Sequence, residues 1–239
     1  MEWLNTVWEW IVNFCNSFAH DIYRNFIVDN RYLLVLDGLK ITIIISICAI
    51  LMGVVFGSIV TLLRRSRFRI PRAIGYVYVD IIRGTPMVTQ LLVTYFVIFG
   101  TVHIDPVLIA IVAFGINSGA YVSEIIRAGI LSIDKGQMEA GRSLGLSKSM
   151  TMTHIVLPQA VKNILPTLCN EFVVLIKETA VVGYLAIPDL TKAGDIIRSR
   201  TFDFDMPLVA VAVIYYIIIK FLTLAISALE RRLRKSDLR

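Results

Sequence analysis

An uninterrupted apolar run near the N-terminus constrains this chain more than any other feature. Between Lys40 and Arg64 the sequence reads ITIIISICAILMGVVFGSIVTLL, 23 residues without a charge. About 20 apolar residues in a helix can cross the hydrocarbon core of a bilayer, where every backbone polar group must be hydrogen-bonded within the chain. The run therefore predicts a membrane-spanning helix. The hydrophobic share of the whole chain, 56%, agrees, because soluble domains hold about 45–50%.

Four further apolar stretches follow, at about 76–99, 105–127, 155–177 and 207–229. Residues 1–35 instead hold three tryptophans and scattered apolar residues interrupted by charges, a pattern typical of an amphipathic segment at the membrane interface. We therefore predict an all-α polytopic membrane protein with three regions. These are an interfacial, extracytoplasmic segment (1–35), a transmembrane domain with five core helices (36–230) and a basic cytoplasmic tail (231–239).

The distribution of charge predicts the orientation in the membrane, because cytoplasmic loops are enriched in Lys and Arg. The segment 64–72 carries five arginines and no acid, and the last ten residues carry five bases against two acids. Residues 1–37 hold five acids and two bases, and residues 178–206 hold five acids and three bases. We therefore expect the N-terminus outside a bacterial cytoplasmic membrane, the loop 128–154 inside and the C-terminus inside.

The same charges and the cysteines argue against other classes of protein. The net charge of +6 comes from helix ends, so it indicates membrane orientation and no nucleic-acid partner. Three widely separated cysteines form no CxxC pair, and we expect no metal site and no cofactor. No phosphate-binding GxxxxGK[ST] loop is present, so any ATP has to bind another chain.

One polar segment, EAGRSLGLSKSMTMTHIVLPQ at 139–159, interrupts the apolar pattern. A short helix is expected over 137–144, ended by Gly145, and Pro158 suits the start of the next span. From the pattern alone the segment is either an ordinary loop between two spans or a docking element for a cytoplasmic partner.

The spacing within this segment resembles the EAA loop of ATP-binding-cassette (ABC) importer permeases, with Gly141 in place of the usual second alanine. The residues that fit are Glu139, Ala140, Gly141, Gly145, Ile155, Leu157 and Pro158. The stretches RGTP (83–86), SGAYVSEIIRAGILSIDKGQ (118–137) and LPQAVKNILPTLCNEFVVLIKET (157–179) narrow the likeness to permeases for polar amino acids. The resemblance covers about residues 35–230 and implies the type I permease fold, with a non-catalytic transport subunit.

The resemblance also implies partners and a coupling helix. Residues 139–150 are expected to enter a groove of a separate ABC ATPase, present in two copies, so that nucleotide-driven movement passes into the membrane. The residues expected to make this contact are Glu139, Ala140, Gly141, Leu144, Gly145 and Leu146. The further partners implied are a second permease, either a copy of this chain or a homologue, an extracytoplasmic solute-binding protein, an amino acid and the lipid bilayer.

Polar residues inside predicted spans are the candidates for solute contact. In the fourth span, Glu171 and Glu178 lie seven residues apart, about 10 Å along one helix face. Two acids favour a basic amino acid, although recognition of the α-amino group or neutralisation of Glu178 by Lys177 are alternatives. The remaining candidates for substrate binding are Asn170, Asn117, Ser118 and Tyr121, whereas the neighbouring Gly115 and Gly119 suit close helix packing.

Gly84, Thr85 and Pro86 predict an irregular helix, because proline removes a backbone donor and disfavours helix at the preceding residue. The site is either a packing kink or a hinge with a role in gating.

Two other classes of function compete with the importer permease. A self-sufficient secondary transporter is the main alternative, but such proteins show paired repeats with broken helices, and no internal repeat is visible. An intramembrane enzyme needs a catalytic constellation, and the three histidines all fall in loops or at span ends.

Overall fold

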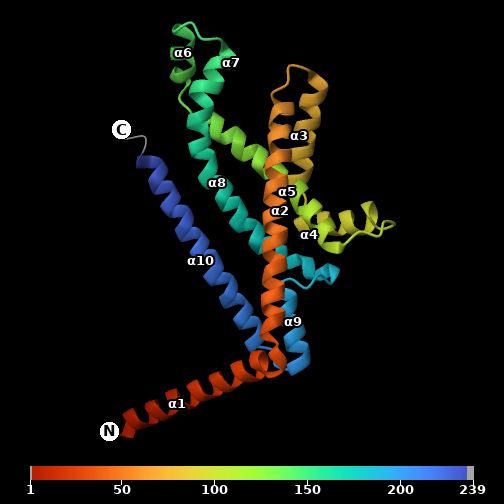
Figure 1. The fold of residues 1–239 in the computed structure, drawn as a ribbon, viewed down its shortest axis with the longest axis vertical. Helices are drawn as coiled ribbons and strands as arrows, with labels where there is room; N and C mark the ends of the chain where they lie inside the picture. The colour runs from red at the N-terminus through yellow and green to blue at the C-terminus, as the bar shows by residue number, and fades with distance from the viewer. Residues whose placement is uncertain (1, 236–239) are drawn as a thin grey trace.

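The computed structural model describes residues 2–235, which form helices and connecting loops without any strand in that range. The elements are α1 (Glu2–Ile22), η1 (Tyr23–Ile27), η2 (Val28–Asn30), α2 (Tyr32–Arg64), α3 (Arg69–Arg83), α4 (Met87–Val93), η3 (Thr94–Ile98), α5 (Pro106–Leu131), α6 (Lys135–Ser143), α7 (Lys148–Thr151), η4 (Met152–Val156), α8 (Leu157–Glu178), η5 (Thr179–Leu185), α9 (Leu190–Thr201) and α10 (Met206–Lys235). In Figure 1, α6 and α7 lie at one end of the long axis, and α1 and α9 lie at the other.

Three helices among the described residues are long and apolar enough to cross a membrane: α2, α5 and α10 over Met206–Leu233. A bent pair, Arg69–Arg83 with Met87–Ile98, raises the number to four when it counts as one span. All five predicted stretches form helices: the second is the bent pair, with its break at the predicted irregularity, and the fourth is α8, which is too polar to count as a span by apolarity alone. The longest helix, α2, has 33 residues and extends about 50 Å, starting nine residues before the apolar run.

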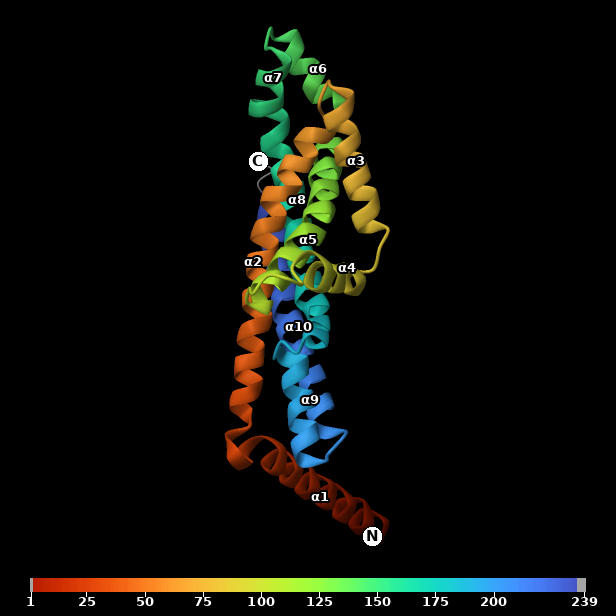
Figure 2. The same ribbon diagram turned by 90° about the vertical axis from the view of Figure 1, so that its right-hand side faces the viewer.

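The second predicted span is two helices that meet at an angle of 108°. α3 ends at Arg83, and Pro86 caps the start of α4 in an extended conformation. Pro86 cannot donate a backbone hydrogen bond and holds Thr85 out of helical geometry, which explains why the break falls here. Figure 2 shows α4 lying across the direction of α3 and α5.

The fourth predicted span, α8, is absent from the apolar set although its 22 residues extend about 33 Å. Its sequence is too polar, because Gln159, Lys162, Asn163, Asn170 and Glu171 recur along it. α8 packs against α5, α10 and α2, so much of its surface faces protein.

Glycines allow α2 and α5 to pack at close range. A Cβ added at Gly57 would lie 2.7 Å from the Cβ of Val122 and 2.8 Å from the carbonyl oxygen of Gly119, and one added at Gly53 would lie 2.7 Å from the Ser118 hydroxyl. From the other side, a Cβ at Gly115 would lie 2.6 Å from the sulfur of Met52. These contacts confirm that Gly115 and Gly119 serve helix packing, as the small-residue spacing indicates.

The largest apolar core lies where α2, α4, α5, α8 and η5 meet. Its fully buried members include Ile45, Leu91, Phe114, Leu175 and Val182. The break after α3 turns α4 toward this core, and Leu91 of α4 is buried there as a result.

The N-terminal helix is tied to the far end of the bundle through the segment that follows it. The Asn25 amide, fully buried, donates to a carboxylate oxygen of Asp203 over 2.7 Å, and the Arg24 guanidinium donates to the carbonyl oxygen of Thr201 over 2.7 Å. Burial raises the pKa of the Asp203 carboxyl. The hydrogen bonds from Asn25 and from two backbone N–H groups outweigh this effect and hold that pKa below its ordinary value. The orientation of α1 is therefore set by contacts to the loop after α9.

Candidate functional site

A polar cavity of about 570 Å³ lies between α5 and α8. It is lined by Arg83, Tyr121, Glu124, Ile125, Ala128, Gly129, Ser132, Asn163, Thr167, Asn170, Glu171 and Val174. The volume falls in the range of small-molecule sites, about 300–1,000 Å³. Charged and amide side chains inside a membrane domain are the usual marks of a solute path.

Three of the six residues expected to contact substrate line this cavity: Tyr121, Asn170 and Glu171. Ser118 is fully buried behind them and donates its hydroxyl to a Glu171 carboxylate oxygen over 3.3 Å. Glu178, the last residue of α8, is not among the residues that line this cavity. A site that uses both acids for a basic amino acid therefore stays a prediction.

Asn117 belongs instead to a hydrogen-bonded bridge that holds the helix break. Its side-chain amide donates to the Gln90 side-chain oxygen over 2.9 Å. The Gln90 amide nitrogen donates in turn to the Thr85 hydroxyl over 2.8 Å and to the carbonyl oxygen of Ile82 over 2.7 Å. The three residues of the predicted hinge, Gly84 to Pro86, are therefore connected to α5 by side-chain hydrogen bonds.

Arginines and one acid form a cluster beside the cavity. The Glu124 carboxylate accepts from the Arg64 guanidinium over 2.5 Å through one oxygen and from the Arg127 guanidinium over 2.7 Å through the other. Glu124 and Arg127 are three residues apart on α5, a spacing that allows an ion pair on one helix face, whereas Arg64 reaches Glu124 from α2. Nearby, the Arg83 guanidinium lies 5.4 Å from the centre of the Tyr121 ring, within cation–π range.

The polar segment after α5 forms two short helices joined by a turn, and the short helix expected over 137–144 and ended by Gly145 corresponds to α6. α6 begins at Lys135, with the Asp134 carboxylate accepting from the backbone N–H of Gly136, and ends at Ser143. Gly145 follows with φ +83°, a left-handed conformation that favours glycine and stops the helix. The Ser147 hydroxyl then accepts from the backbone N–H of Met150 and caps α7.

The residues expected to contact an ATPase fall on both sides of this turn. Glu139, Ala140, Leu144 and Gly145 are exposed, Leu146 is half-buried and Gly141 is buried. A Cβ at Gly141 would lie 2.4 Å from a methyl group of Thr151, which explains the glycine at a position where alanine is usual. Leu144 is 80% exposed at the tip and offers an apolar contact.

Several residues of the site carried no signal in the sequence pattern. Gln90 and Arg83 flank the break; Gln90 meets Asn117 because the chain turns by 108° there, and Arg83 meets Tyr121 because α3 packs against α5. Thr167 and Asn163 line the cavity one and two turns before Glu171, and their spacing of four and eight residues could have identified them. Among residues 2–235, no three His, Cys, Asp or Glu side chains are grouped closely enough to hold a metal ion.

Comparison with known proteins places these features in a family. The family described as "Binding-protein-dependent transport system inner membrane component" matches residues 41–235. An arginine transport system permease protein of Bacillus subtilis (strain 168) is 39% identical over 205 residues, which are 85% of this chain and 94% of that protein. A glutamine transport system permease protein of Escherichia coli (strain K12) is 37% identical over 204 residues, 84% and 93% of the two chains.

A solved structure supports the same assignment. The crystal structure of an amino acid ABC transporter with histidines superimposes with a TM-score of 0.82 at 40% identity, covering 87% of this chain and 98% of that one. These likenesses confirm the fold class and do not favour a self-sufficient secondary transporter. The chain belongs to the family of binding-protein-dependent transport system inner membrane components, and it is the permease subunit of an ABC transporter.

Proposed function

We propose that this chain forms the translocation pathway of an ATP-driven importer for a polar amino acid. The observation that carries the proposal is the cavity between α5 and α8, where Glu171 and Arg83 line one space. An amino acid carries both an ammonium and a carboxylate group, so a site with one acid and one base suits its two charges. Relatives named for arginine and glutamine transport support an amino acid as the solute.

The Glu171 carboxylate is available to bind a solute, whereas the Glu124 carboxylate is already paired with arginines. Both oxygens of Glu124 accept from arginines. Glu171 receives only the Ser118 hydroxyl at 3.3 Å among the described residues. A solute ammonium is the partner that a half-buried carboxylate of this kind favours. Asn170 adds amide donors and acceptors, and the Tyr121 ring adds an apolar face.

The segment of α6 and α7 supports a coupling role for the chain. We infer that its exposed tip, with Glu139, Ala140 and Leu144, enters a groove of a separate ABC ATPase, and that two ATPase copies serve two permeases. The second permease is a copy of this chain or a homologue. Because α6 and α7 are tied to α5 and α8, a push on the tip moves both walls of the cavity.

At the other end of the bundle, α9 and its flanking loops suit an extracytoplasmic solute-binding protein. The surface carries Lys192, Asp195 and Arg198, with the Asp195 carboxylate 2.9 Å from the Lys192 ammonium and 2.6 Å from the Arg198 guanidinium. Hydrogen bonds from Lys192 hold the pKa of Asp195 below its ordinary value. We infer that the N-terminus lies outside and the C-terminus in the cytoplasm, which the distribution of basic residues supports.

We propose that α1 lies along the outer membrane surface. Val7, Ile11, Phe18 and Ile22 share one helix face and are all more than a third exposed, while residues 5, 9, 13, 16 and 20 are polar and share the opposite face. The tryptophans at 3, 8 and 10 are 66–74% exposed, and indole rings prefer the headgroup level of a bilayer. In Figure 1, α1 leaves the bundle at the start of α2 and runs at a wide angle to it.

The function is tested by ATPase activity in proteoliposomes, with this chain co-purified with its ATPase and its binding protein. Each of the twenty amino acids is added to wild type, to Glu171→Gln and to Glu178→Gln. We expect a polar amino acid to stimulate hydrolysis in wild type and in Glu178→Gln, because Glu178 lies outside the cavity. We expect that stimulation to fall by about tenfold or more in Glu171→Gln, since a lost charge-assisted bond is worth about 1.5–3 kcal/mol.

The two variants separate the importer function from the site. Stimulation that is equal in wild type and Glu171→Gln rejects the cavity as the solute site and leaves the importer intact. Stimulation confined to basic amino acids and lost in both variants restores the site with two acids. Absence of stimulation by any amino acid in wild type rejects amino acid import.

A further inference from the structure

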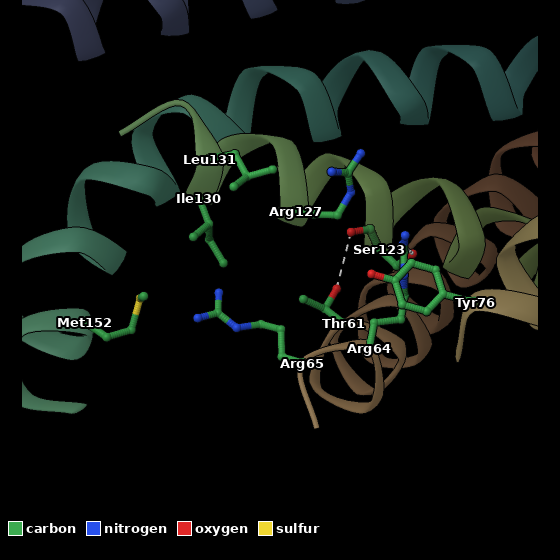
Figure 3. Close-up of a pocket in the computed structure, with 9 residues that line it drawn as sticks. All are labelled: Thr61, Arg64, Arg65, Tyr76, Ser123, Arg127, Ile130, Leu131 and Met152. Atoms are coloured by element: carbon green, nitrogen blue, oxygen red, sulfur yellow. Dashed lines mark hydrogen bonds between the residues drawn. The ribbon is translucent and has the colours of Figure 1, made fainter. Parts of the chain in front are cut away.

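A second cavity, of about 450 Å³, lies between the end of α2, the last turns of α5 and the segment η4. Figure 3 shows its lining, which is Thr61, Arg64, Arg65, Tyr76, Ser123, Arg127, Ile130, Leu131 and Met152. Three arginines and no acid line the cavity. None of these nine residues lines the proposed translocation site, so this is a different space.

The arginines of this cavity carry more positive charge than the chain neutralises. The only acid paired with them among residues 2–235 is Glu124, which binds Arg64 and Arg127. Arg65 is exposed, and its side chain makes no ion pair or hydrogen bond with any residue in the described range. In Figure 3 the Arg65 guanidinium points into the space between Ile130 and Met152.

Arg64 adds positive charge from behind the cavity wall. Its side chain is only 9% exposed, and one terminal nitrogen donates to Glu124 over 2.5 Å and to the Ser123 hydroxyl over 3.4 Å. Its guanidinium lies 4.6 Å from the centre of the Tyr76 ring, and its buried Nε is not open to a ligand in the cavity. Among the described residues, Arg65 is therefore the arginine with an unpaired guanidinium at this cavity.

The other walls of the cavity are apolar. Ile130 and Leu131 are at the end of α5, with Leu131 68% exposed, and Met152 is in η4. An anion flanked by an apolar surface at the end of two membrane helices has the two-part character of a lipid, a charged head group on a hydrocarbon tail. Basic pockets between helices on the cytoplasmic side bind acidic head groups for this reason.

We propose that the cavity of Arg64, Arg65 and Arg127 binds the phosphate group of an acidic phospholipid of the cytoplasmic leaflet. Arg65 supplies the free guanidinium, Arg64 and Arg127 add positive charge at the cavity wall, and Ile130, Leu131 and Met152 contact the glycerol and the first carbons of the acyl chains. Because Met152 directly follows α7, a bound lipid also touches the segment that leads to the proposed ATPase contact.

The test is native mass spectrometry of the permease–ATPase complex. The complex is extracted from nanodiscs of phosphatidylcholine that contain phosphatidylglycerol at about 20 mole per cent, on the scale of a bacterial membrane. Wild type is compared with Arg65→Gln and with Arg67→Gln. Arg67 is the matched control: it is equally basic and two residues away, but it stacks on Phe68, with 4.8 Å to the ring centre, and does not line the cavity.

We expect wild type and Arg67→Gln to retain phosphatidylglycerol in preference to phosphatidylcholine, and Arg65→Gln to retain about tenfold less, as for one lost charge-assisted bond. Addition of inorganic phosphate distinguishes the source of the phosphate group. If millimolar phosphate displaces no lipid, the lipid head group is the ligand. If millimolar phosphate displaces the lipid fully, the site binds free phosphate and the lipid assignment is wrong. Equal retention in Arg65→Gln and Arg67→Gln, or no preference for the acidic lipid, overturns the proposal.

Discussion

Replacing Gly57 by alanine tests whether the contact of α2 with α5 holds the bundle together. The new Cβ lies 2.7 Å from two carbons of Val122 and 2.8 Å from the carbonyl oxygen of Gly119. Ordinary carbon contacts are about 3.5–4.0 Å, so the two helices have to separate by roughly 1 Å. Two of the three atoms belong to backbone or to the Cβ of a β-branched residue, and neither can swing away.

Forcing one methyl group into a filled interface costs about 1–3 kcal/mol, which lowers the equilibrium constant for folding by about 5- to 150-fold. The assay is unfolding by SDS in mixed micelles, followed by far-UV circular dichroism. Gly183→Ala is the control, because a Cβ there meets nothing closer than 3.6 Å and φ is not positive. The control is expected to change the free energy of unfolding by no more than about 0.5 kcal/mol.

The reasoning is refuted if Gly57→Ala unfolds with the wild-type free energy, or if Gly183→Ala loses as much. The first result means that the helices are not in close contact in the membrane. The second means that any added methyl group is harmful, irrespective of the space around it.

Three further predictions follow from other parts of the molecule. Leu144→Asp is expected to weaken binding of the ATPase by about tenfold or more in a pull-down titration, since burying an apolar side chain that is 80% exposed contributes about 1.5–3 kcal/mol to binding. The control is Leu62→Ala, on α2, which is expected to leave that affinity unchanged. Asp203→Asn is expected to lower the free energy of unfolding by about 1 kcal/mol at pH 7. Because the pKa of Asp203 is lowered in the folded state, this stabilisation is present above the ordinary aspartate pKa and is lost as the pH falls through the folded-state pKa. Below that pKa the free energies of unfolding of wild type and variant are expected to converge, and a difference that persists in strong acid contradicts the bond to Asn25. Finally, all three tryptophans of the chain lie in α1, so brominated lipids in proteoliposomes are expected to quench its intrinsic fluorescence, and emission typical of water with no quenching contradicts an interfacial α1.

The sequence predicted the apolar spans well because hydrocarbon imposes a strong local rule on backbone and length. α2, α5 and α10 follow directly from runs of uncharged residues. The break at Pro86 was also predictable, since proline acts on its immediate neighbours. The angle of 108° was not, because it depends on how Leu91 and Gln90 pack against α5.

The candidate site was predicted only in part, for a related reason. Glu171 and Asn170 stand out as polar residues in an apolar helix, and both line the cavity. Glu178 shares a helix face with Glu171 in the sequence pattern but is not among the residues that line the cavity. Arg83 was missed because its contact with Tyr121 depends on the packing of α3 against α5, which the local sequence does not reveal.

The polarity of α8 has a consequence for how the protein enters the membrane. A helix that carries Lys162, Glu171 and two asparagines partitions poorly from water into lipid on its own, since each charged side chain at the centre adds about 2.5–3.5 kcal/mol to the insertion free energy. The surfaces that receive those side chains belong largely to α5, which is synthesised first and inserts by its own apolarity. Membrane insertion of α8 is therefore expected to be assisted by α5, which is already inserted beside the translocon, and to be delayed when α5 is deleted.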